Sequence, residues 1–387
     1  MTVQLDYKAK QYIPAFDGWR GVGIIMVLIA HCFPSSITRS FWVAMDLFFV
    51  MSGFLITGIL LDSRSNKNYY VNYITRRVLR VFPVYYFVLA ISFLVIPALF
   101  PYIMGRDYDY YMKHQAWFWL YGQNWLLSFT GFPKNHTMIH FWSLAVEEQF
   151  YIFWPFLIKF FNSRKLLKIC IGLILFSFYF RIDLGSRLGL VQPYPYVATL
   201  SRMDAISIGA IVAILIRERK EWLEKYVNYF ACVSAIFVVV GFLYYRSTNF
   251  MEVSPLYTFV DVFAGCILLY SMSQRKPWII RLGDHPIFRF FGKYSYGIYI
   301  YHYIIFNLLM YNLAPNLGIR HRFISEFVIA ALTIGLSVAV SLISYRYIEK
   351  PFLKLKKYFS YDKSKASSPR QAPEVDEVKI EKDVILN

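Results

Sequence analysis

Ten apolar stretches, each about as long as a membrane is thick, follow one another along this 387-residue chain. A transmembrane helix needs about 20 predominantly apolar residues. A hydropathy window of about 19 residues picks out spans at residues 18–34, 41–61, 82–101, 140–161, 166–183, 197–216, 227–245, 255–273, 292–312 and 323–347. Only 17% of the residues are charged, whereas soluble domains carry about 25%. We therefore predict an all-α integral membrane protein with about ten transmembrane helices.

The lysine and arginine residues between the spans set the predicted orientation. They cluster in alternate gaps, at residues 64–80, 159–168, 217–225 and 275–293, and they are sparser in the other gaps. Cytoplasmic loops of membrane proteins carry an excess of Lys and Arg. We therefore predict that both termini are cytoplasmic. The same distribution explains the net charge of +17 as a topology signal, so no nucleic-acid partner is expected.

The two ends of the chain are polar. The segment before the first span has neither an apolar core nor a small-residue cleavage site, so the first span is expected to stay in the mature chain. Residues 1–357 are assigned to one transmembrane domain. Residues 358–387 are rich in Ser, Pro and charge, which predicts a short disordered cytoplasmic tail. The aromatic segment 114–128 is too short for a span and is expected to form an interfacial helix.

The first span carries an ionisable residue at each end. In FDGWRGVGIIMVLIAH, which runs from Phe16 to His31, ten uncharged residues separate Arg20 from His31. On an α-helix, eleven steps leave the two side chains about 20° apart around the axis and about 16 Å apart along it. One helix face therefore holds a cation at one depth and a titratable imidazole at another. An ionisable group at membrane depth is costly and marks a functional site by default.

Further ionisable residues lie inside the predicted spans. We expect an acid, base and cation cluster around His31 in the outer half of the bundle, formed with Asp46, Glu147, Glu148, Arg202, Asp204 and His302. A structural alternative stays open for several of them. A lone histidine such as His302 suits an interhelical hydrogen bond, and Arg202 with Asp204 suits a structural ion pair. Glu147 and Glu148 point about 100° apart, so only one of them is expected to face the site.

Three arginines lie at the cytoplasmic mouth of the third span. In YITRRVLRVFP, Arg76, Arg77 and Arg80 lie at i, i+1 and i+4, so Arg76 and Arg80 share a helix face. Paired guanidinium groups suit multiply charged phosphates. Acyl-CoA has a matching shape, because a charged nucleotide end continues into a long thin arm that carries the acyl group. The arginines are therefore interpreted as a phosphate clamp, or alternatively as topology signals that contact lipid head groups.

Several other chemistries lack their sequence pattern. No G-x-S-x-G surrounds Ser52 or Ser295. His136 and His140 stand at i, i+4 without the glutamate of H-E-x-x-H and without an evident third ligand, so no metal is expected. No histidine is followed by an aspartate five residues later, which removes the H-x-x-x-x-D pattern of glycerolipid acyltransferases.

Six segments between residues 14 and 352 resemble the membrane-bound acyltransferase-3 family, which includes O-antigen and exopolysaccharide O-acetylases. In chain order they are FDGWRG…AH, AMDLFFVMSGFLI, RRVLRVFPVYY, HFWSLAVEEQFYIFWP, KYSYGIYIYH and YIEKPF. The resemblance implies that Arg20 and His31 form the essential Arg-x10-His pair and that Asp46 belongs to the D-L-F-F motif. The arginines before span three fall on Arg76, Arg77 and Arg80, and the W-S-x-x-x-E-E motif falls on Trp142, Ser143, Glu147 and Glu148.

The resemblance implies a membrane O-acyltransferase of the bacterial cytoplasmic membrane. It would move an acyl group, expected to be acetyl, from cytoplasmic acyl-CoA to a hydroxyl of an extracytoplasmic carbohydrate, such as a cell-surface polysaccharide or lipid-linked glycan. His31 is the expected general base, although an acyl-histidine intermediate stays open. Asp46 or Glu147 would orient the imidazole, and Arg20 with the three arginines would hold the donor. Ser143 either donates a hydrogen bond or begins the fourth span.

A transporter of an acylated glycan or small solute is the alternative function, because buried charges and a polar path suit both classes. Transporters usually show repeat-related halves with broken helices, and no such symmetry is recognisable here.

Many longer relatives append an extracytoplasmic hydrolase-like domain, so this membrane domain is expected to acylate its acceptor directly or with a separate protein. We expect a channel from Arg76–Arg80 past Arg20 to His31. The sequence leaves the acceptor, the acyl length and the oligomeric state open.

Overall fold

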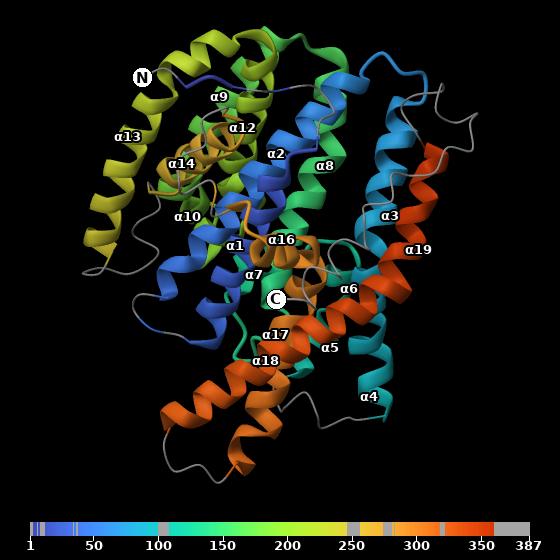
Figure 1. The fold of residues 1–387 in the computed structure, drawn as a ribbon. Coiled ribbons are helices and arrows are strands. Elements are labelled where there is room, and N and C mark those ends of the chain that lie inside the picture. Colours follow the sequence, from blue (N-terminus) through green and yellow to red (C-terminus); the bar gives the residue numbers. More distant parts are fainter. Residues whose placement is uncertain are drawn as a thin grey trace, which may run out of the picture.

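The computed structural model describes residues 3–5, 7, 12–33, 35, 38–99, 108–245, 256–273, 281, 283–317 and 322–359. Apart from one isolated β-bridge between Leu5 and Ser273, the elements in these ranges are helical (Figure 1). A helix covers each of the ten apolar stretches: α1 (Pro14–Cys32), α2 (Ala44–Ser63), α3 (Tyr69–Ala90), α8 (Trp142–Phe160), α9 (Ser163–Tyr179), α12 (Thr199–Glu218), α13 (Lys220–Tyr245), α14 (Leu256–Ser271), α17 (Ser295–Asn312) and α18 (Arg322–Ser344).

Six helical segments in the described part of the chain are long and apolar enough to cross a membrane. They are Pro14–Cys32, Ser40–Ser63, Tyr69–Leu99, Tyr194–Glu218, Lys220–Leu243 and Ile324–Phe359. Leu256–Ser271 is apolar but shorter. The remaining apolar helices do not reach that length or apolarity; α8, for example, carries Glu147 and Glu148. The prediction of an all-helical, multi-pass protein is confirmed with six or more candidate membrane-spanning helices, while the count of about ten crossings stays a prediction.

Short helices connect and extend the long ones. They are η1 (Thr38–Val43), η2 (Ile91–Val95), α4 (Ile96–Leu99), α5 (Asp109–Lys113), α6 (Gln115–Trp119), α7 (Gln123–Thr130), η4 (Ile139–Phe141), η5 (Phe180–Leu184), α10 (Gly185–Arg187), α11 (Tyr194–Val197), α16 (Pro286–Lys293), η7 (Ala314–Asn316), η8 (Tyr345–Glu349), α19 (Lys350–Leu355) and η9 (Lys356–Phe359).

Three element boundaries differ from the sequence prediction. Helix α3 begins at Tyr69 instead of residue 82, because a hydropathy window rejects its polar first turns although they are helical. The helix expected over residues 114–128 is broken into α6 and α7, since Tyr121 adopts a φ of 54°. The helical chain continues through Phe359, two residues beyond the expected domain boundary at 357. The remainder of the predicted tail, residues 360–387, lies outside the described residues.

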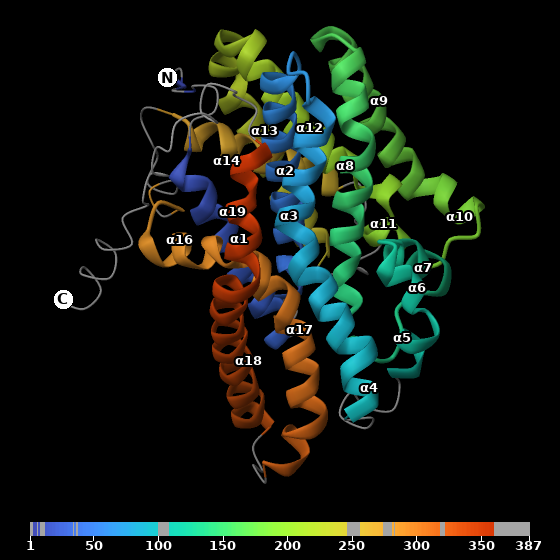
Figure 2. The ribbon, with the colours of Figure 1, turned by 90° about the vertical axis from the view of Figure 1, so that its right-hand side faces the viewer.

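Close helix contacts position the two charged regions of the bundle. Helices α2 and α12 approach through Gly53 and Gly209, where an added Cβ would come within 2.0 Å of a backbone carbonyl oxygen of the other helix. Helices α1 and α16 approach in the same way at Gly21, next to Arg20, where a Cβ would lie 1.8 Å from the Phe288 carbonyl oxygen. Small residues permit such close backbone packing in membrane helices. At the other side of the bundle, α19 runs beside α3 (Figure 2).

Candidate active site

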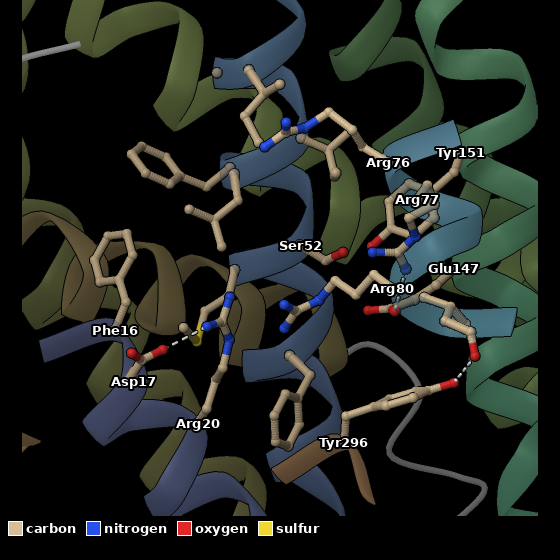
Figure 3. Close-up of a pocket in the computed structure, with 18 of the residues that line it drawn as sticks. Phe16, Asp17, Arg20, Ser52, Arg76, Arg77, Arg80, Glu147, Tyr151 and Tyr296 are labelled. Carbon is tan, nitrogen blue, oxygen red and sulfur yellow. Dashed lines mark hydrogen bonds and ion pairs between the residues drawn. The ribbon is translucent and has the colours of Figure 1, made fainter. Parts of the chain in front are cut away.

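A cavity of about 760 Å³ opens among α1, α2, α3, α8 and α17. Its lining contains six basic side chains, Arg20, Arg76, Arg77, Arg80, Arg217 and Lys356, and three carboxylates, Asp17, Asp62 and Glu147. The excess of positive charge favours an anionic ligand. Figure 3 shows the guanidinium groups of Arg20 and Arg80, from α1 and α3, pointing into the same space. The structure therefore brings together Arg20 and all three arginines that the sequence analysis assigned to the donor.

Two of the cavity arginines are paired with carboxylates on its edge. Arg20 donates to Asp17 across one helical turn at 2.7 Å, and Arg217 donates to Asp62 through two bonds of 3.0 Å each. The guanidinium of Arg217 also lies over the Tyr7 ring, 5.0 Å from its centroid. These pairs hold the two cations in place and reduce the charge that each offers to a ligand.

Arg77 connects α3 to both adjacent glutamates of α8. It donates to Glu148 at 2.9 Å and to Glu147 at 3.3 Å, and its guanidinium stacks 3.8 Å from the centroid of the Tyr151 ring. Glu147 lines the cavity, whereas Glu148 is buried beside it. A partly buried arginine with two carboxylates and an aromatic platform is fixed in position. This arrangement makes Arg77 part of the cavity wall.

Arg80 differs from its neighbours because its side chain is exposed to the cavity and has no ion-pair or hydrogen-bond partner in the described part of the chain. Arg76 instead donates to backbone carbonyls of the C-terminal turn η9, to Lys356 at 2.9 Å and to Phe359 at 3.4 Å. The three arginines of the RRVLR motif therefore have three different environments. Arg80 is the one whose guanidinium is available to a phosphate.

His31 lies at the Cys32 end of α1, where it meets His302 of α17. The Nδ1 atom of His31 lies 3.0 Å from Nε2 of His302, and Nδ1 of His302 lies 2.7 Å from the backbone carbonyl oxygen of Tyr299. Because a carbonyl oxygen can only accept, we assign the proton of neutral His302 to Nδ1. Its Nε2 then accepts from Nδ1–H of His31. This chain of bonds leaves Nε2 of His31 unprotonated, which is the state that a general base requires.

Aromatic side chains surround the two histidines. The Tyr303 ring stacks on His31 with centroids 4.3 Å apart, and His140 packs edge-on to His302 at 5.1 Å. His136, in the segment before α8, interacts electrostatically with His31. Burial lowers the pKa of His136, so its imidazole is neutral at pH 7 and adds no positive charge near His31.

Tyr299 connects the cavity to the histidine pair. Its hydroxyl donates to the His140 carbonyl oxygen at 2.5 Å and lies 2.6 Å from Oγ of Ser143, and both Tyr299 and Ser143 line the cavity. Its backbone carbonyl holds His302. Ser143 and Tyr299 therefore link the cavity lining to His140 and His302 through hydrogen bonds. Although Ser143 lies in the first turn of α8, its side chain contacts Tyr299 and does not cap the helix.

Asp46 belongs to a second cluster that is separate from His31. It accepts from Arg202, and both side chains are fully buried. Sequence reasoning assigned Asp46 or Glu147 to orient His31; in the structure the described hydrogen-bond partner of the His31 ring is His302. A shared place in the outer half of the bundle does not fix the direction in which a side chain points.

Arg202 and Asp204, for which a structural ion pair was one of two open alternatives, each form an ion pair with a different residue. Residues at i and i+2 do not face each other on a helix, so Asp204 pairs with Arg181 of η5 at 2.8 Å while Arg202 pairs with Asp46. Asp261 of α14 is also fully buried and interacts electrostatically with Asp46 and Arg202.

Trp142, at the start of α8, packs against the aromatic rings of Phe49 and Tyr196 and is buried away from the cavity lining. The contacts of this ring are therefore structural. In the described ranges, no group of three or more His, Cys, Asp or Glu side chains is arranged to hold a metal ion.

Several residues of these clusters were not predicted from the sequence. Arg181 and Asp261 interrupt apolar stretches, so the argument that selected Asp46 would also have selected them. His140 precedes the W-S-x-x-x-E-E motif but was weighed only as a metal ligand. Tyr299 lies in the family-resembling segment KYSYGIYIYH, but that segment contains four tyrosines and does not distinguish Tyr299 from the others.

The chain is similar to known proteins over the range that holds this site. The family model described as an acyltransferase domain, Acyl_transf_3, matches residues 13–346. The chain belongs to the acyltransferase-3 family. It is a multi-pass integral membrane protein, and its bacterial relatives point to the cytoplasmic membrane.

Two relatives carry descriptive names. One, "Peptidoglycan O-acetyltransferase OatA" of Listeria monocytogenes, is 27% identical over 384 residues, which cover 89% of this chain and 56% of the relative. "O-acetyltransferase OatA" of Staphylococcus aureus is 26% identical over 378 residues, which cover 89% of this chain and 58% of the relative. The chain thus spans less than two thirds of the length of these relatives. No solved structure matches the chain.

The residue range that matches the family model includes His31, His302 and most of the residues that line the cavity. It ends at residue 346, inside the π-helical turn η8. The helices α19 and η9 lie beyond it, although Lys356 of η9 lines the same cavity as Arg80.

Proposed function

We propose that this acyltransferase-3 protein is a membrane O-acetyltransferase that uses acetyl-CoA as its donor and a carbohydrate hydroxyl as its acceptor. The observation that carries the proposal is the arrangement on α1. Arg20 faces an arginine-rich cavity at one end of the helix, and His31 lies at the other end with its Nε2 atom free to accept a proton.

The donor would bind in the cavity of about 760 Å³. The phosphates of CoA would lie against Arg80 and Arg20, because phosphate groups accept charge-assisted hydrogen bonds from guanidinium groups. The pantetheine arm would then run along the cavity toward Ser143 and Tyr299, and the thioester would lie one side chain away from the histidine pair. The apolar part of the wall, including Met51, Phe54 and Leu55, suits an uncharged arm.

At the acceptor end, Nε2 of His31 would remove the proton of an acceptor hydroxyl while its oxygen attacks the thioester carbon. The carbonyl then re-forms as the C–S bond breaks, and the departing thiolate takes the proton from the imidazolium. His302 would keep His31 in the productive tautomer throughout. A covalent acyl-histidine intermediate would use the same Nε2 atom as nucleophile.

We further propose that ten helices cross the membrane, that both termini are cytoplasmic, and that residues 1–357 act as one transmembrane domain. The proposal is supported by a helix at each apolar stretch and by the alternating Lys and Arg content of the gaps. In this orientation the arginine-rich cavity opens toward the cytoplasm, where acyl-CoA is found. His31 then lies near the outer face.

The acceptor class is suggested by the named relatives. Since one relative carries the name of a peptidoglycan O-acetyltransferase, we propose a cell-envelope polysaccharide as the acceptor. Trp117 of the aromatic helix α6 and Leu120, which directly follows α6, are exposed and suit either a sugar face or the membrane interface.

The test is acetyl transfer by the purified full chain. Wild-type protein, His31→Ala and His114→Ala would be incubated with radiolabelled acetyl-CoA and peptidoglycan fragments, and both thiol release and labelled glycan would be measured. His114 is a matched control because its imidazole forms a hydrogen bond with the Tyr110 carbonyl oxygen of the preceding helix α5 and does not line the cavity. We expect His31→Ala to lose at least about 100-fold in rate and His114→Ala to keep it. Full activity in a folded His31→Ala protein would refute the mechanism. No thiol release by any of the three proteins would favour a transporter.

A further inference from the structure

The C-terminal turn η9 (Lys356–Phe359) reaches the donor cavity although it lies outside the range that matches the family model. Arg76 of α3 fastens this turn by donating to the backbone carbonyl oxygens of Lys356 at 2.9 Å and Phe359 at 3.4 Å. Helix α19, which leads into it, packs against α3. The turn is therefore attached to the same helix that presents Arg80.

Fastening the turn brings the Lys356 side chain into the cavity wall. Lys356 is half-buried and lines the cavity together with Arg76, Arg77 and Arg80, with which it interacts electrostatically. Among the ion pairs in the described part of the chain, none includes Lys356 or Arg80. Within the described ranges, Arg80 and Lys356 thus face one space without a direct ion pair, although Glu349 and Asp17 lie near enough to Arg80 to attract it electrostatically. Arg20 and Arg217 each bond one carboxylate, and Arg77 bonds two.

Lys356 and the three arginines lie close enough to repel one another, and a bound polyanion would reduce that repulsion. The chemistry that fits two such cations beside a cavity is a phosphate group. A lysine ammonium binds phosphate as a compact point charge with three donors, and it complements the planar guanidinium of Arg80.

We propose that Lys356 is a donor-binding residue that holds a phosphate of the acyl-CoA nucleotide together with Arg80, and that Arg76 is a positioning residue that fastens Lys356 in place. This inference rests on the proposed acyl-CoA donor. The three arginines of the RRVLR motif would then have different roles. Arg77 forms part of the cavity wall, Arg80 binds phosphate, and Arg76 holds the turn that carries Lys356.

The experiment measures binding of CoA, 3′-dephospho-CoA and pantetheine to the purified full chain by calorimetry. The variants are Lys356→Gln, the conservative Lys356→Arg, and Lys357→Gln. Lys357 is the matched control, since it is exposed, does not line the cavity and lies over the Tyr358 ring at 4.9 Å. We expect Lys356→Gln to weaken CoA binding about 10-fold, the usual loss for one charge-assisted bond, while pantetheine binding stays unchanged. Lys356→Arg and Lys357→Gln should bind CoA like the wild type.

A double-mutant cycle tests the positioning role. If Arg76 acts through Lys356, then Arg76→Gln weakens CoA binding about as much as Lys356→Gln, and the double variant is no weaker than either. Additive losses would show that Arg76 binds phosphate independently and would overturn the positioning role. Turnover at saturating donor should not change in Lys356→Gln, so the effect appears in KM and not in kcat.

The role of Lys356 would be overturned if Lys356→Gln bound CoA with unchanged affinity, or if it lost affinity for pantetheine equally. It would also be overturned if Lys356→Gln changed only the dependence of CoA binding on anionic phospholipid in the detergent micelles. That last result would identify a lipid head group as the source of the phosphate. Absence of CoA binding by the wild type is a different outcome, because it would refute the proposed donor itself.

Discussion

Replacing His302 tests whether the histidine pair sets the base. His302→Phe keeps an aromatic ring, although a larger one, but removes the Nε2 acceptor that lies 3.0 Å from Nδ1 of His31. The imidazole of His31 would then be free to exchange tautomers and to rotate, and in the wrong tautomer its Nε2 carries a proton and cannot act as a base. A neutral hydrogen bond contributes about 1 kcal/mol, which is about fivefold in tautomer population.

Loss of orientation adds to the loss of tautomer control. Partners that orient metal-binding imidazoles are worth about 10- to 100-fold, and we expect kcat to fall by a similar factor here while CoA affinity is retained. The assay is the initial rate of thiol release from acetyl-CoA with acceptor present, together with the thermal unfolding temperature in detergent. Tyr303→Phe is the matched control, because it keeps the ring that stacks on His31 at 4.3 Å. A His302→Phe protein with the wild-type rate would refute the tautomer argument, and so would equal losses in kcat, CoA affinity and stability.

Two further predictions concern the charged clusters. Arg80→Ala should raise the KM for acetyl-CoA by about 10- to 100-fold with little change in kcat, because it removes a guanidinium that can donate hydrogen bonds to a phosphate of the donor. An unchanged KM for acetyl-CoA in initial-rate measurements would contradict this role. Arg202→Met should cost about 3–5 kcal/mol of stability by leaving Asp46 buried without its partner. Adding Asp46→Leu should restore part of that loss in thermal unfolding, and a double variant no more stable than Arg202→Met would show that the pair is not structural.

The sequence predicted the helices better than their contacts. Each apolar stretch lies on a helix because about 20 apolar residues must satisfy their own backbone in a membrane. The start of α3 at Tyr69 was missed because hydropathy measures apolarity, while helix continuity at a membrane surface depends on backbone bonds that polar residues also make. The break at Tyr121 depends on a single backbone dihedral that the aromatic composition does not reveal.

The candidate site was predicted as a set of residues but not as a set of partners. The sequence grouped Arg20 with Arg80 through the family resemblance, and the structure places both side chains in the lining of one cavity. The sequence could not indicate which helices neighbour one another. His31 therefore pairs with His302, 271 residues away, and Asp46 pairs with Arg202, 156 residues away. Such long-range pairs depend on helix packing, for example at Gly53 and Gly209.

The central claim is that donor and acceptor meet from opposite faces of the membrane, with the cavity at Arg80 open to the cytoplasm and His31 near the outer face. The most direct test uses sealed proteoliposomes of known protein orientation, with membrane-impermeant acetyl-CoA added on one side and a glycan acceptor enclosed on the other. We predict acetylated glycan only when acetyl-CoA is on the side of the Arg80 cavity and the glycan is on the side of His31. Acetylated glycan formed only when both substrates are on the cytoplasmic side would contradict the claim.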